Sequence, residues 1–103
     1  MLTVARLIEM LEAEWAEDGF LGRLRRGTFE PSGYTRLKEK LDLIRFKEGD
    51  AIDRRLVSLL WFVPTLMSYQ RERVAERGGD VAALDQALNE VRSKLLRDIL
   101  GTP

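Results

Sequence analysis

The chain has 103 residues, contains neither cysteine nor histidine, and carries 17 basic and 17 acidic side chains, which leave no net charge. The missing residue types exclude disulfides, thiolate nucleophiles, imidazole acid/base catalysis and Cys/His metal sites, and we expect neither a cofactor nor a bound metal. The zero net charge removes any overall attraction to nucleic acid or to an anionic membrane, and the length predicts one domain with one core.

A first helix is predicted from about Thr3 to Asp18. Its apolar residues repeat at helical spacing on one face and end at Trp15, and Gly19 stops the pattern. The acidic side chains of this segment lie mostly off that stripe, which is typical of a solvated face; they are Glu9, Glu12, Glu14, Glu17 and Asp18. Because these charges interrupt the apolar residues, the segment does not resemble a signal peptide, and we expect a cytoplasmic protein.

The next stretch, residues 19–29, places three glycines among aromatic, apolar and arginine residues. It predicts a short helical turn or structured loop. Aromatic and arginine side chains are enriched where proteins bind each other, so this stretch and the preceding tryptophan form a candidate recognition surface. Its residues are Trp15, Phe20, Arg23, Arg25, Arg26 and Phe29. The alternative is that the arginines pair with the acids of the first helix and form part of the architecture.

A second helix is predicted to begin at Pro31–Ser32–Gly33 and to stop before Gly49. Its apolar stripe includes Tyr34, Leu37, Leu41 and Ile44. Asp50 follows as the expected N-cap of a third helix.

The third helix is predicted to be the longest, reaching Gly78–Gly79, with a kink near residues 60–64 or a break at Pro64. Its apolar stretch is too short to cross a bilayer. Trp61 and Phe62 widen the apolar surface beyond one face, so they are candidates for a seam between two copies of the chain.

The last helix is predicted to begin after Asp80 and to end near Gly101. Leu84, Leu88, Val91 and Leu95 alternate three and four residues apart. The seam is too short for a free coiled coil, so we expect it to pack against the other helices.

Charge is unevenly distributed along the chain, since residues 1–18 hold five acids and one base while residues 19–47 hold eight bases and three acids. The basic stretch is an alternative nucleic-acid site, consisting of Arg23, Arg25, Arg26, Arg36, Lys38, Lys40, Arg45 and Lys47. A second alternative is an enzyme that uses only carboxylates and arginines.

The sequence therefore predicts an all-α bundle of four main helices, with a short helical turn between the first two and a proline kink in the third. We expect a small, bacterial-type cytoplasmic protein that acts by protein–protein contact and not by catalysis, of the adaptor, antitoxin or immunity kind. A protein partner or a second copy is expected, and neither nucleic acid nor membrane.

Overall fold

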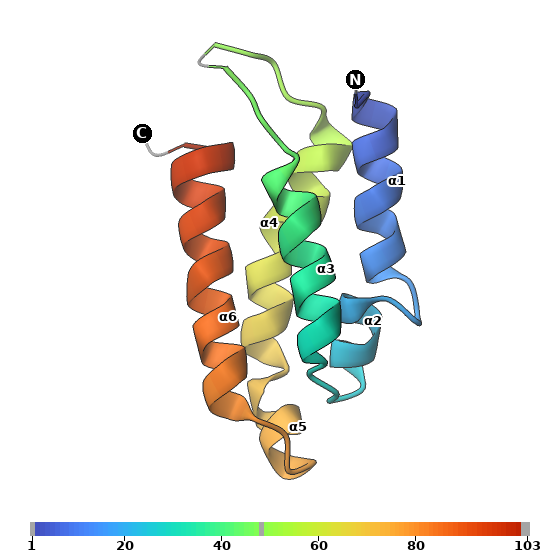
Figure 1. Cartoon of the computed structure of the whole chain (residues 1–103), viewed down its shortest axis with the longest axis vertical. Coiled ribbons are helices and arrows are strands. Elements are labelled where there is room, and N and C mark those ends of the chain that lie inside the picture. The colour runs from blue at the N-terminus through green and yellow to red at the C-terminus, as the bar shows by residue number, and fades with distance from the viewer. Residues whose placement is uncertain (1, 48, 102–103) are drawn as a thin grey trace.

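Apolar side chains at helical spacing bring four main helices together around one core in the computed structural model, which describes residues 2–47 and 49–101 (Figure 1). The four are α1 (Val4–Trp15), α3 (Pro31–Asp42), α4 (Arg54–Tyr69) and α6 (Val81–Lys94). Two short helices, α2 (Phe20–Arg25) and α5 (Arg71–Glu76), lie in the connections, and a π-helical turn, η1 (Leu95–Ile99), continues α6. The predicted all-α bundle, with its helical turn after Gly19, is confirmed.

Helix α4 lies at the centre of the bundle, behind α3 in Figure 1 and in contact with α1, α2 and α6. Its inward face is completely buried at Leu56, Leu60, Val63 and Met67. The seam predicted for the last helix is buried as well, from Leu84 to Leu95. Burial of these side chains, each contributing about 1.5–3 kcal/mol relative to exposure, makes α4 the helix around which the others pack.

One predicted helix end and one predicted N-cap are wrong because backbone polar groups find partners in turns. Helix α1 ends at Trp15, not Asp18, and Ala16 is extended. Helix α3 ends at Asp42, well before Gly49. Asp50 does not cap α4, because its carboxylate accepts from the Lys47 N–H at 2.7 Å within a local turn. The N-cap is Asp53, whose side chain accepts from the first N–H groups of α4.

The long third helix is divided, but not at Pro64. Helix α4 includes Pro64 and continues to Tyr69. Of the two outcomes predicted for Pro64, a kink or a break, the break does not occur. The division falls at Gln70, which is both the C-cap of α4 and the N-cap of α5. The turn there buries Val74 completely. It also places Arg71 in a two-pronged ion pair with Asp85 of α6.

Across residues 2–47 and 49–101, none of the helices combines the length and the apolar character that a bilayer span requires.

Candidate functional site

The six residues predicted as one recognition surface do not lie on one surface. Phe20 is fully buried. Its ring packs in the core, and its backbone N–H donates to the Glu14 carboxylate. Phe29 is half-buried and packs edge-on against Phe20, with the ring centroids 5.8 Å apart. These two aromatic rings form an internal cluster with Tyr34. Phe20 is therefore unavailable to a partner.

Arg23 and Arg26 are held by groups of their own neighbourhood. Arg23 donates to the Asp18 carbonyl and to the Glu30 carboxylate, and Arg26 donates to the carboxylate and carbonyl of Glu17. The Arg26–Glu17 pair is of the kind that the sequence left as the alternative, with an acid of the first predicted helix, whereas Arg23 pairs with Glu30 outside that segment. The two arginines stabilise the turns at the ends of α2.

Glu14 differs from the other acids of α1 because its side chain is only 1% exposed. The expectation of a solvated acidic face is wrong at this position. The carboxylate accepts from the Phe20 N–H, from Arg36 and from Lys40 of α3, the last at 2.6 Å. Burial raises the pKa of Glu14, but the hydrogen bonds from Arg36, Lys40 and Phe20 outweigh it and lower the pKa to about 2. A carboxylate that stays ionised and is fully hydrogen-bonded is an architectural group, since a general acid needs a raised pKa.

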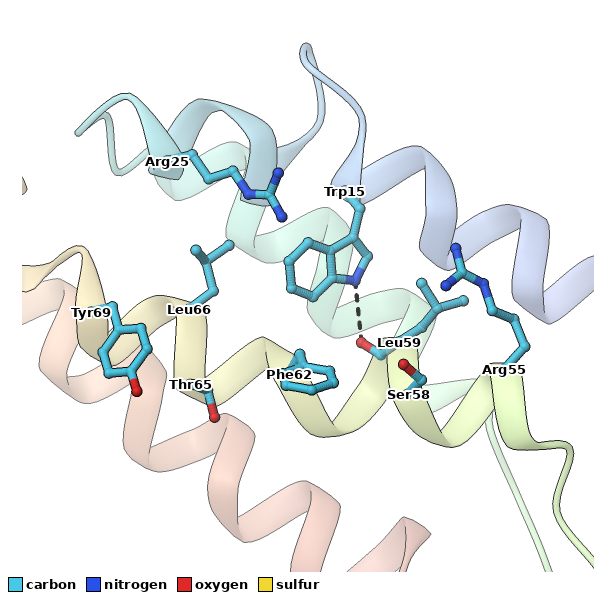
Figure 2. Close-up of a pocket in the computed structure, with 9 residues that line it drawn as sticks. All are labelled: Trp15, Arg25, Arg55, Ser58, Leu59, Phe62, Thr65, Leu66 and Tyr69. Atoms are coloured by element: carbon cyan, nitrogen blue, oxygen red, sulfur yellow. Dashed lines mark hydrogen bonds between the residues drawn. The ribbon is translucent and has the colours of Figure 1, made fainter.

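Trp15 and Arg25, the remaining two predicted residues, line a groove between α1, α2 and α4 (Figure 2). We call it the α1–α4 groove; it has a volume of about 560 Å³. Its lining residues are Trp15, Arg25, Arg55, Ser58, Leu59, Phe62, Thr65, Leu66 and Tyr69.

Trp15 is fixed in the wall of this groove. Its indole N–H donates to the Leu59 carbonyl of α4 at 3.2 Å, shown as the dashed line in Figure 2. The Arg25 guanidinium lies over the indole ring, with its central carbon 5.3 Å from the centroid. The groove thus has a rigid aromatic wall with a cation on it.

A second groove lies on the other side of α4, against α6 and η1, with a volume of about 390 Å³. We call it the α4–α6 groove. It is lined by Trp61, Pro64, Thr65, Ser68, Tyr69, Arg92, Leu95 and Leu96. Thr65 and Tyr69 line both grooves, so the two are adjacent on either side of the outer face of α4.

Between the grooves, α4 exposes large aromatic side chains to solvent. The exposed fractions are 56% for Trp61, 53% for Phe62 and 78% for Tyr69. We call these three residues, with Thr65 and the two grooves, the α4 surface. Trp61 and Phe62, predicted as a seam between copies, therefore lie where another molecule has access to them. Tyr69, Arg55 and Arg92 were missed by the sequence reasoning, although the spacing of residues 58, 62, 65 and 69 marks a second stripe on α4.

The charged residues that line the two grooves are all arginines: Arg25, Arg55 and Arg92. Arg55 pairs with Glu12 at 2.9 Å, whereas Arg25 and Arg92 form no ion pair with a described carboxylate. In a chain with no net charge, the α4 surface is locally cationic.

A cleft between α3 and α6 has a different character, since most of its charged groups pair with one another. Lys38 pairs with Glu90, and Lys94 with both Asp42 and Asp98. The Tyr34 hydroxyl donates into the same network, and its pKa is raised by burial and by Glu90. No group of three or more acidic residues in the described ranges is arranged to hold a metal ion.

Comparison with family models, with curated proteins and with solved structures finds no match for this chain.

Proposed function

We propose that this chain is a cytoplasmic binding protein without catalytic activity, which acts by protein–protein contact at the α4 surface. The observation that carries the proposal is the exposure of Trp61, Phe62 and Tyr69 between two adjacent grooves. Contiguous exposed aromatic surface is unfavourable in water unless a partner covers it, and aromatic and arginine side chains are typical of interface hot spots.

The charge arrangement favours this function over the two alternatives. Arg36 and Lys40 of the basic stretch are bonded to Glu14, and Arg23 and Arg26 to Glu30 and Glu17, so these cations are not free to bind phosphates. The buried carboxylate of Glu14 has a lowered pKa because of its hydrogen bonds from Arg36 and Lys40. A general acid needs a raised pKa, so this arrangement argues against general acid catalysis.

The test compares Phe62→Glu with Leu43→Glu, which changes an apolar side chain of similar exposure, 53% against 49%, outside both grooves. Tagged wild-type and variant chains are used to capture proteins from the host, and the captured partner is then purified and titrated directly. We expect Phe62→Glu to reduce affinity by about 100-fold, the loss typical of a central aromatic contact. We expect Leu43→Glu to bind like the wild type.

Equal binding by both variants, with unchanged melting temperatures, would place the interface elsewhere and overturn the proposal. The narrower roles are then distinguished by the partner itself. An antitoxin or immunity protein requires a partner that harms the host when expressed alone, whereas an adaptor requires two partners that bind at once.

A further inference from the structure

The α1–α4 groove has features that indicate what kind of partner segment it accepts. Its apolar lining comes from both sides, with Trp15 on α1 and with Leu66 and Phe62 on α4 (Figure 2). Trp15 is immobilised by its hydrogen bond to the Leu59 carbonyl. A concave, preformed apolar groove accepts a convex row of apolar side chains at a low cost in ordering.

The length of the groove matches several turns of a helix. Its lining residues on α4 extend from Arg55 to Tyr69. At 1.5 Å per residue this corresponds to about 20 Å, so a helix of roughly 14 residues lies along it with four apolar anchors at helical spacing.

The charged residues that line the groove indicate the sign of the charge that the partner segment carries. Arg55 lies at one end, and Arg25 lies on the far side of Trp15 from it (Figure 2). No carboxylate lines the groove among the described residues. Glu12 already pairs with Arg55 at 2.9 Å, whereas Arg25 pairs with no described carboxylate. An occupant with acidic side chains beside its apolar row therefore gains attraction at Arg25, whereas a basic occupant is repelled there.

These features favour a partner helix over a second copy of the chain and over a membrane. A second copy packed groove against groove brings its own Arg25 and Arg55 against the same arginines. A bilayer would receive Phe62 and Tyr69, which protrude, but it would leave the groove itself unfilled, because Trp15, Leu59 and Leu66 are buried or only partly exposed.

Building on the proposed function, we infer that the α1–α4 groove binds an acidic amphipathic helix of a partner protein. Apolar side chains of that helix, spaced i, i+4, i+7 and i+11, occupy the space between Trp15 and Phe62. Its carboxylates pair with Arg25.

The probes are three synthetic peptides of about 18 residues, a length that covers the groove with one turn to spare. The first has leucine at the four anchor positions and glutamate on the flanks. The second has lysine in place of glutamate, and the third has the composition of the first in scrambled order. Binding to vesicles of phosphatidylglycerol and phosphatidylcholine tests whether the groove binds a membrane. Sedimentation of the chain alone tests whether it self-associates.

Binding is measured on the full chain by peptide fluorescence anisotropy and by the NMR signals of the two tryptophan indoles. Trp15 lies in the α1–α4 groove and Trp61 in the α4–α6 groove, so the two signals report the two grooves separately. We expect the acidic peptide to bind at least tenfold more tightly than the basic and scrambled peptides, and to shift the Trp15 indole signal more than the Trp61 signal.

Arg25→Glu should weaken binding of the acidic peptide by about tenfold, with the loss decreasing at high salt. Arg55→Glu should have a smaller effect, because Glu12 already pairs with Arg55. Arg26→Glu is the matched control, because Arg26 is the neighbour of Arg25 but is bonded to Glu17 outside the groove. It should leave peptide binding unchanged.

Equal binding of acidic and basic peptides, a response confined to Trp61, binding only to the anionic vesicles, or dimerisation that Phe62→Glu abolishes would each overturn the inference. Failure of the proposed function gives a different result from failure of this inference. If the proposed function is wrong, Phe62→Glu leaves partner capture intact. If Phe62→Glu abolishes capture while Arg25→Glu and Arg55→Glu do not affect it, only the acidic helix is wrong.

Discussion

Glu14 connects three segments of the chain through one buried charge. Its carboxylate accepts from the start of α2 at Phe20 and from Arg36 and Lys40 of α3. Removal of one member of a buried, hydrogen-bonded charge cluster leaves the others without their partner, which is more costly than the loss of an exposed ion pair.

We therefore predict that Glu14→Gln lowers the free energy of unfolding by about 2–4 kcal/mol at pH 7, measured by urea denaturation. Glu9→Gln is the control, since Glu9 pairs with Arg6 where both side chains are exposed. We expect that change to cost less than about 0.5 kcal/mol. Similar values for the two variants would show that the cluster does not stabilise the fold.

The same carboxylate makes stability depend on pH. The pKa of Glu14 is lowered from 4.5 to about 2 in the folded chain, so the unfolded chain binds the proton more tightly. The stabilisation is complete above pH 4.5 and is lost as the pH falls toward 2, at most about 3 kcal/mol in all. The difference between wild type and Glu14→Gln should accordingly shrink between pH 5 and pH 2.5, and a constant difference would contradict the assignment.

Gly22 is required because α2 packs directly against the backbone that follows α1. A Cβ atom on Gly22 would collide with the Ala16 carbonyl oxygen, whereas one on Gly49 meets nothing within 4 Å. We predict that Gly22→Ala destabilises the chain by about 3 kcal/mol, because backbone cannot yield as a flexible side chain does. Gly49→Ala should cost about 1 kcal/mol, from its φ of 87° alone. Thermal melts of the two variants test this order.

At the scale of elements, Pro64 is the residue whose local preference opposes the helix that contains it. It removes the amide that would bond the Leu60 carbonyl, yet α4 continues to Tyr69. We predict that Pro64→Ala raises stability by about 1 kcal/mol, since the gain in helix hydrogen bonding exceeds the gain in unfolded-state entropy. Ser68→Ala, one turn later and exposed, is the control and should change stability by less than about 0.5 kcal/mol. A lower melting temperature for Pro64→Ala would mean that the ring is needed for packing in the α4–α6 groove.

The number of helices and their buried faces were predictable from the sequence because the side chains that a helix buries in the core recur at helical spacing. Leu41 and Leu88, for example, belong to the predicted apolar stripes and are buried. Helix ends were less predictable, since they depend on contacts between distant segments. Nothing local in Tyr69–Gln70–Arg71 stops a helix; the turn at Gln70 is favoured by burial of Val74 and by the pairing of Arg71 with Asp85.

The candidate site was predictable only in part, for a related reason. Residue type identified aromatics and arginines near α2, but the fold buries Phe20 and pairs Arg23 and Arg26 within the chain. Trp15 and Arg25 gain their place in the α1–α4 groove from contact with α4, which no local pattern encodes. Trp61 and Phe62 were detectable because they extend the apolar surface of α4 beyond the width that its core contacts can bury.

At the scale of the whole molecule, the uneven charge of the sequence is neutralised largely by folding. Acids of α1 and of the turns meet cations of residues 19–47, as in the pairs of Glu14 with Arg36 and Lys40. Glu30 and Glu17 similarly engage Arg23 and Arg26. The basic stretch is therefore not a continuous cationic face, and phosphate binding depends on such a face.

We accordingly predict that the chain binds a duplex DNA of about 30 base pairs no more tightly than a Kd of roughly 100 µM at 0.15 M salt, the weak end of nonspecific binding. Fluorescence anisotropy of labelled DNA measures this. The combined variant Glu17→Gln, Glu30→Gln is an informative control, because it frees Arg26 and Arg23 while leaving the α1–α4 groove unchanged. It should bind DNA more tightly than the wild type, with a steeper dependence on salt. A wild-type Kd in the low micromolar range that rises steeply with salt would instead show that the remaining cations suffice, and nucleic-acid binding would then replace protein binding as the function to pursue.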